Sequence, residues 1–205
     1  MKIAILGSSF DPPHLGHYLI TTQVKEFLKM DEIWLMPCYQ NPLHKDKQLV
    51  STKDRYSMAK LLTNTHIKVY DYEIKHKQTS YSINTLNAFA KKYPHHSFYW
   101  IIGSDLLDEF RDWKDWQKII KNYHLIIFPR ETVIAHLRDK VKQALKLKII
   151  PKNIVILDSY ELVLTNISST MIRTKIRSKK SIKYLVPQEV EEYIIKNKLY
   201  VNPQD

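Results

Sequence analysis

Glycine and cysteine are both scarce in this chain. Three of its 205 residues are glycine, and Cys38 is its one cysteine. A lone cysteine excludes an internal disulfide, and there is no zinc-type cysteine pattern, which agrees with a reducing compartment. The glycines are unevenly placed, since Gly7 and Gly16 fall in one ten-residue loop. That placement does not fit a flexible linker.

Long apolar runs are also absent. No window comes near the ~20 consecutive apolar residues of a transmembrane helix, and the first residues resemble a strand rather than a signal peptide. We therefore expect a cytoplasmic protein with no membrane partner. With 44% hydrophobic and 26% charged residues, the chain is long enough to bury a core. We expect one domain over residues 1–205, with a small C-terminal helical portion from about 168 to 205.

Acidic residues are outnumbered, and the formal net charge is +11. The excess is concentrated in residues 140–183, which hold eleven lysines and arginines against only Asp158 and Glu161. A basic surface can follow a nucleic-acid backbone or attract small polyphosphates. Alternatively, the lysines solvate exposed helix faces, and we favour that interpretation for most of them. Nucleic acid is therefore not the expected partner, and formation of a homo-oligomer stays open.

The first eighteen residues carry the most informative local pattern. An apolar run over residues 2–6 predicts a buried strand. A loop of small residues follows, and a helical pattern begins after His14. The first amides of a helix lack intrahelical partners and carry partial positive charge, so this arrangement is typical of a phosphate site. His14 and His17 can both donate hydrogen bonds to phosphate oxygens, and Gly16 leaves room for a ligand.

The rest of the chain alternates apolar runs with amphipathic helical patterns. This alternation predicts an α/β fold, a Rossmann-like doubly wound parallel sheet with helices on both faces. Ligands bind such sheets at the carboxyl ends of the strands. The further strands are expected at 33–36, 67–74, 98–102, 124–128 and 154–157.

Several polar residues are expected at those strand ends. Lys45, in the loop after the second strand, can reach phosphates held by the first loop. Gly103 and Asp105 directly follow the fourth strand. An aspartate there suits ribose hydroxyls, although capping the next helix is an equally physical role.

Two further segments are candidates for binding. Residues 167–173 form a hydroxyl-rich helix start, where Ser168 to Thr170 can cap the helix and Arg173 offers a planar fork for phosphate oxygens. Residues 78–86 are a polar helix start whose amides can bind an acidic group. Trp113 lies off the stripe formed by Trp116 and the residues after it, so it can stack on a flat heteroaromatic ring.

Taken together, the motifs resemble those of the bacterial nicotinate-nucleotide adenylyltransferases, in the HxGH nucleotidyltransferase superfamily. The first motif reads G7-x-F10-D11-P12-x-H14-x-G16-H17, and the second is ISSTMIR at 167–173. The resemblance extends along nearly the whole chain. It includes NPLHK (41–45), TSYSINTL (79–86), IIGSD (101–105), DW (112–113), FPR (128–130) and the closing segment 184–200.

The resemblance implies transfer of AMP from ATP to nicotinic acid mononucleotide, with Mg²⁺ carried by ATP and no metal site of the protein's own. It implies catalytic roles for His14, His17, Lys45 and Arg173. The implied ATP-binding residues are Gly7, Ser8, Ser9, Phe10, His14, Gly16, His17, Ile167, Ser168, Ser169, Thr170 and Arg173. The implied substrate-binding residues are Ser82, Thr85, Gly103, Asp105, Trp113 and Lys114, with the nicotinate carboxylate read by the main-chain amides of Ser82 and Lys114.

Three residues depart from the usual pattern: Ser8 replaces a common glycine, Ser82 a common threonine and Asn84 a common aspartate. Two alternatives follow from the sequence. One is an adenylyltransferase of the same superfamily that acts on nicotinamide mononucleotide or phosphopantetheine. The other is a basic nucleic-acid-binding module, which would lose affinity steeply as salt rises and would turn over no nucleotide.

Overall fold

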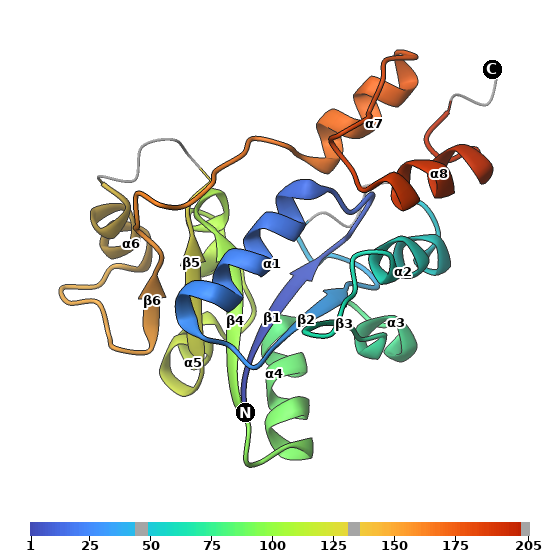
Figure 1. Ribbon diagram of the computed structural model, residues 1–205. Coiled ribbons are helices and arrows are strands. Elements are labelled where there is room, and N and C mark those ends of the chain that lie inside the picture. The colour runs from blue at the N-terminus through green and yellow to red at the C-terminus, as the bar shows by residue number, and fades with distance from the viewer. Residues whose placement is uncertain (44–48, 131–135, 202–205) are drawn as a thin grey trace.

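A computed structural model describes residues 1–43, 49–130 and 136–201. Six parallel strands form one sheet in the order β3-β2-β1-β4-β5-β6, with helices packed on both sides (Figure 1). The predicted doubly wound α/β fold is therefore confirmed. The strands are β1 Lys2–Ser8, β2 Glu32–Pro37, β3 Ile67–Val69, β4 Ser97–Gly103, β5 His124–Phe128 and β6 Ile154–Ile156.

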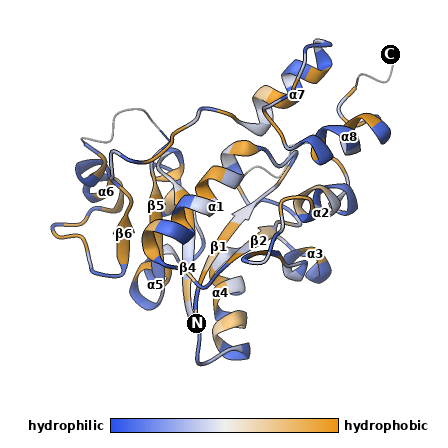
Figure 2. Cartoon of the chain, in the orientation of Figure 1, coloured by the Kyte–Doolittle hydropathy of each residue, from blue (hydrophilic) through white to orange (hydrophobic). Residues whose placement is uncertain are grey.

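The strands are apolar because both faces of the sheet are covered. Along β1, Ala4 and Leu6 point into one core, while Ile3 and Ile5 point into the other. The first face is covered by α1 (Leu15–Leu28), α2 (Thr52–Lys60), α7 (Ser169–Arg177) and α8 (Gln188–Lys196), and the second by α4 (Ser82–Lys92), α5 (Trp116–Asn122) and α6 (Leu137–Leu145). Figure 2 shows hydrophobic and hydrophilic residues side by side on most of these helices, as expected for helices with one buried face.

The predicted third strand, 67–74, is wrong beyond Val69. It pairs with β2 only over Ile67–Val69, and the chain then forms α3 (Tyr72–His76). A lysine–aspartate ion pair of 3.0 Å, between Lys75 and Asp71, spans one turn of this segment. Glu73 is buried in it, so the residues expected to extend the strand instead form a helical turn that packs inward.

The order of the strands reverses between β1 and β4, which lie side by side. The loop after β1 leads into α1, and β4 is followed by two short 3₁₀ turns, η1 (Ser104–Leu106) and η2 (Phe110–Asp112). A crevice at such a reversal is where open α/β sheets bind ligands. None of the described helices is both long enough and apolar enough to cross a membrane.

Candidate active site

The start of α1 holds two histidine rings in contact. His14 is the N-cap residue in an extended conformation, and its ring centroid lies 3.8 Å from that of His17. The backbone N–H of His14 donates to Nδ1 of His17 at 3.3 Å. Nδ1 is thus an acceptor, and in the neutral ring the proton must be on Nε2. That Nε2 lies 3.2 Å from Oγ of Ser8, at the end of β1.

Both histidines are neutral in the ligand-free protein. Burial first, and then the positive charge of Arg130, lower the pKa of His14 to about 3. The pKa of His17 also lies well below its ordinary value, because of burial first, then His14 and then Arg130. The pair therefore offers N–H donors rather than fixed positive charges.

The start of α7 packs directly on the loop that precedes α1. Ser169 donates its hydroxyl to the carbonyl of Pro12 at 2.8 Å, and Arg173 donates from Nη1 to the carbonyl of Asp11 at 2.6 Å. The carbonyl of Ile167 lies 3.3 Å from the position that a Cβ on Gly16 would occupy. Two helix N-termini from opposite ends of the chain therefore converge, and Gly16 permits that contact.

The side chains at the start of α7 are mainly used by the protein itself. Ser168 Oγ accepts the Met171 N–H at 3.2 Å as an N-cap, and Thr170 Oγ1 lies 3.1 Å from Nη2 of Arg173. The Arg173 side chain is only 10% exposed and its Nη1 lies 3.6 Å from Oδ2 of Asp11. What this helix start offers to a ligand is its main-chain amides rather than free hydroxyls.

Arg130 lies at the same junction and was missed as a site residue. Its N–H donates to Oγ of Ser104 at 2.9 Å, and its Nη2 donates to the carbonyl of Ile167 at 3.0 Å. Its Nε lies 4.0 Å from Oδ2 of Asp105. Its position two residues after the strand 124–128 was the available signal, because that strand end faces the ligand crevice.

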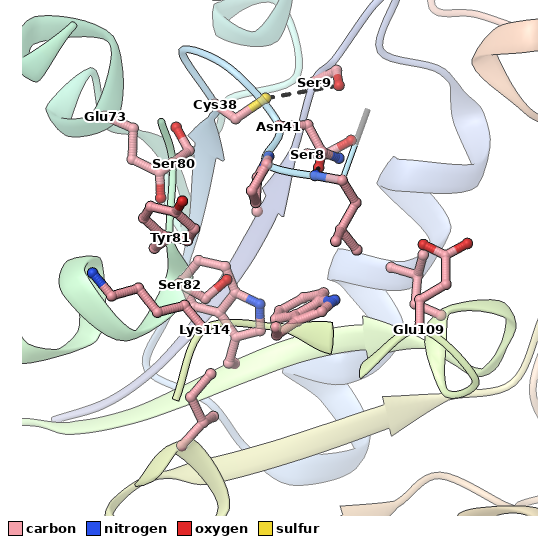
Figure 3. A pocket seen from close by; sticks show the side chains of 17 residues that line it. Ser8, Ser9, Cys38, Asn41, Glu73, Ser80, Tyr81, Ser82, Glu109 and Lys114 are labelled. Carbon is pink, nitrogen blue, oxygen red and sulfur yellow. Dashed lines mark hydrogen bonds between the residues drawn. The ribbon is translucent and has the colours of Figure 1, made fainter. Parts of the chain in front are cut away.

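A cavity of about 240 Å³ opens beside the first loop; we call it the side pocket (Figure 3). Residues from the β1 loop, the β2 loop, the start of α4 and the segment after β4 line it. The predicted residues brought together there are Gly7, Ser8, Ser9, Ser82, Trp113 and Lys114. Lys114 Nζ also lies 4.8 Å from the centre of the Tyr81 ring.

Thr85 does not line the side pocket, contrary to its predicted contact with substrate. It is 1% exposed, and its hydroxyl donates to Oε1 of Glu73 at 2.6 Å. Glu73 does line the pocket, and burial raises the pKa of its carboxyl, partly offset by hydrogen bonds from Thr85 and Ser80. Thr85 is thus an internal support that ties α4 to α3.

Three other predicted residues lie at the rim or beneath the site. Phe10 is fully buried, and its ring lies 4.9 Å from that of His17, so its side chain supports the histidine instead of facing a ligand. Gly103 and Asp105 lie next to Arg130 and outside the lining of the side pocket. Lys45 falls outside the described residues.

A second arginine, Arg55, was also missed. It is 1% exposed, and its guanidinium donates to main-chain carbonyls of Ser9 at 2.8 Å, Cys38 at 2.7 Å and Tyr39 at 3.2 Å. It therefore joins the β1 loop to the β2 loop beneath the side pocket. Arg55 shares the i, i+3, i+4, i+7 spacing of the buried residues Met58, Ala59 and Leu62, and that spacing was the signal.

The fold and the site define a class. A doubly wound parallel sheet, in which two helix N-termini converge at the loop after β1 and a pocket with an aromatic wall lies beside them, has the arrangement typical of nucleotide-binding α/β proteins. The sequence profile of the cytidylyltransferase-like family matches residues 5–175.

Relatives and solved structures narrow that class. A probable nicotinate-nucleotide adenylyltransferase of Cytophaga hutchinsonii is 36% identical, over 98% of this chain and 100% of its own length. One from Caldicellulosiruptor saccharolyticus is 38% identical, over 98% and 99%. The chain therefore belongs to the nicotinate-nucleotide adenylyltransferases, within the cytidylyltransferase-like family. The same fold occurs in Plasmodium falciparum nicotinic acid mononucleotide adenylyltransferase complexed with NaAD, with a TM-score of 0.79, 24% identity and 97% of each chain covered.

Proposed function

We propose that this chain transfers the adenylyl group of ATP to nicotinic acid mononucleotide, forming deamido-NAD and pyrophosphate. The observation that carries the proposal is the position of Ser8. Its hydroxyl contacts His17, and the same residue lines the side pocket. An ATP phosphate at the histidines and a mononucleotide in the pocket would therefore meet at one loop.

The chemistry requires charge placement rather than a protein nucleophile. A phosphate oxygen of the mononucleotide attacks the α-phosphorus of ATP in line, the bond to the bridging oxygen breaks, and pyrophosphate leaves. His17 would donate Nε2–H to an oxygen of the α-phosphate, where charge builds up in the transition state. His14, Arg130 and the main-chain amides of α1 and α7 would face the remaining phosphates.

The resemblance implied catalytic roles for Arg173 and Lys45, with both side chains at the ATP phosphates. For Arg173, the contacts with Asp11 and Thr170 support a different role, in which it fixes the loop that carries the histidines. For Lys45 we keep the prediction that its side chain would neutralise charge on the terminal phosphates of ATP.

The side pocket suits the pyridine half of the mononucleotide. Trp113 would stack on the ring, and the main-chain amides of Ser82 and Lys114 would read the carboxylate. Ser82 is the first residue of α4, where unpaired amides favour an anion. Gly103 and Asp105 remain candidates for a ribose, because they lie beside Arg130 at the rim.

We further propose that Mg²⁺ enters with ATP. Within residues 1–43, 49–130 and 136–201, no group of three histidine, cysteine or acidic side chains is placed to hold a metal ion. Mg²⁺ commonly keeps several waters and binds through substrate phosphates. Its chemistry would be to offset charge on the triphosphate.

One assay tests the function. The protein is incubated with ATP and Mg²⁺ and with either nicotinic acid mononucleotide or nicotinamide mononucleotide, and released pyrophosphate is measured. We expect turnover with a strong preference for the acid. Equal rates with both mononucleotides would refute the specificity, and absence of pyrophosphate with either would refute the reaction.

A further inference from the structure

Asp11 is a buried carboxylate in the loop before α1, and the reaction gives it no direct role. It is 1% exposed. Oδ1 accepts the N–H of Val50 at 3.3 Å and the hydroxyl of Tyr200 at 2.9 Å, while Oδ2 lies 3.6 Å from Nη1 of Arg173. A buried charge is costly unless it is paired and hydrogen-bonded, so these contacts fix the position of this loop.

Tyr200 reaches Asp11 from the far end of the chain. After α8, the backbone is left-handed at Lys198 and again at Tyr200, with φ angles of 51° and 64°. Tyr200 then packs against the core cluster that also contains Phe10 and Ile172. Burial and the charge of Asp11 both raise the pKa of Tyr200, so the hydroxyl remains a donor at neutral pH.

Tyr200 and Arg173 hold the same residue from two directions. The tyrosine binds the Asp11 carboxylate, whereas Arg173 donates to the Asp11 main-chain carbonyl. The next carbonyl, that of Pro12, is held by Ser169. His14 follows only two residues later, so a shift at Asp11 moves the start of α1.

We propose that Tyr200 is a positioning residue of the phosphate site, whose hydroxyl fixes Asp11 and thereby the loop that carries His14 and His17. The inference rests on the proposed function, because it assigns Tyr200 to the ATP side of that reaction. The C-terminal segment would then complete the active site and not only cover the sheet.

The chain contains a matched control. Tyr193, on α8, donates its hydroxyl to Oδ1 of Asp54 at 2.9 Å. This is the same kind of contact at the same length, and it also ties the C-terminal segment to an aspartate. Asp54 belongs to α2, and it also contacts Ser51 at the N-cap of that helix. Tyr193→Phe therefore removes a comparable hydrogen bond away from the histidine loop.

The test compares Tyr200→Phe with Tyr193→Phe in steady-state kinetics, with ATP and nicotinic acid mononucleotide varied separately, together with thermal unfolding. We expect Tyr200→Phe to lower kcat/KM for ATP roughly fivefold to tenfold, which is the effect of losing about one ordinary hydrogen bond. The KM for the mononucleotide should stay within about twofold of wild type. Tyr193→Phe should leave both constants unchanged, although both variants lose some thermal stability.

Three results would overturn the inference. They are unchanged ATP kinetics in Tyr200→Phe, equal losses in both variants, and a Tyr200→Phe protein that no longer folds, since the hydroxyl would then serve stability alone. Failure of the proposed function is a separate outcome, because it would appear as wild-type protein that releases no pyrophosphate from ATP with either mononucleotide.

Discussion

The site around His14 and His17, which we call the histidine site, and the side pocket share the loop after β1 but are built differently. The histidine site is assembled from segments far apart in sequence, and its polar side chains are buried and held by other protein groups. The side pocket is also lined by several segments, from the loop after β1 to the segment after β4, but it is open, and Trp113 and Lys114 in its wall are more accessible than the two histidines. We infer that the buried histidine site binds the triphosphate that every reaction of the class uses, while the side pocket binds and selects the second substrate.

This division predicts that the two parts can be damaged separately. Substitutions at the histidine site should act on ATP and on the chemical step, whereas substitutions in the side pocket should act on the mononucleotide. A variant at one site that impaired the substrate of the other site would contradict this division.

The largest effect is expected from His17→Ala. It removes the Nε2–H donor that lies 3.2 Å from Oγ of Ser8, so we expect kcat to fall roughly a hundredfold or more. Binding of nicotinic acid mononucleotide, measured by calorimetry, should change little because the pocket is intact. His17→Gln keeps a side-chain N–H donor and should recover part of the activity. Near-normal turnover by His17→Ala would contradict the assignment.

Trp113→Ala should have the opposite pattern to His17→Ala, because it should impair the mononucleotide and spare ATP. Loss of the stacking surface should raise the KM for the mononucleotide roughly tenfold, with the KM for ATP unchanged within about twofold. Trp113→Phe should retain most of the affinity.

Trp116→Phe is the matched control for Trp113→Phe. Trp116 packs near Phe110, with ring centroids 6.5 Å apart, and it does not line the side pocket. If Trp113→Ala impaired ATP as strongly as the mononucleotide, the two parts would not be separable.

A smaller effect is expected at Glu73. Glu73→Gln keeps a carbonyl to accept the Thr85 hydroxyl and removes a negative charge from the pocket wall. The KM for the acid mononucleotide should fall about twofold to threefold relative to the amide, because a repulsive charge is gone. The ratio of kcat/KM values for the two substrates measures this change, and a shift toward the amide would contradict it.

The same variant makes a prediction about stability. Because the folded pKa of Glu73 is raised, the native protein binds more protons than the unfolded chain between the two pKa values. Wild-type stability should therefore decline as pH rises through the folded pKa. Glu73→Gln lacks that decline, so it should be at least as stable as wild type at pH 8 in urea unfolding.

The sequence predicted the parts of the site that depend on local pattern. The strand–loop–helix start at residues 1–18 and the helix start at Ser168 were predicted because each pattern lies within a few neighbouring residues. Trp113 was separated from Trp116 by helical spacing alone, and it does line the side pocket.

What the sequence did not predict depends on tertiary contacts. Arg55 and Tyr200 have partners that are distant in sequence, such as Ser9 and Asp11. No local pattern says which carbonyl or carboxylate a side chain will meet. Thr85 was misassigned for the same reason, since its partner Glu73 lies in a segment that was expected to be a strand.

The smallest effect is a proton taken up when ATP binds at the histidine site. His14 and His17 are neutral before binding, because burial and Arg130 lower their pKa values. A triphosphate adds negative charge beside them and raises those values, while Arg130 opposes the change. We expect a fractional uptake, below about one proton per ATP at pH 6.5.

Calorimetric titration of a non-hydrolysable ATP analogue, in buffers of different ionisation enthalpy, measures that uptake, and His14→Gln should reduce it. The same pKa shifts determine how the free energy of unfolding depends on pH. Because both folded pKa values lie below the ordinary 6.5, the unfolded chain binds more protons, so the free energy of unfolding should fall as pH drops below about 6.5. The analogue should lessen that fall by favouring protonated histidines in the folded state. Titration of nicotinic acid mononucleotide alone should take up no protons at the histidines, and equal uptake by both ligands would show that the histidine site and the side pocket act as one.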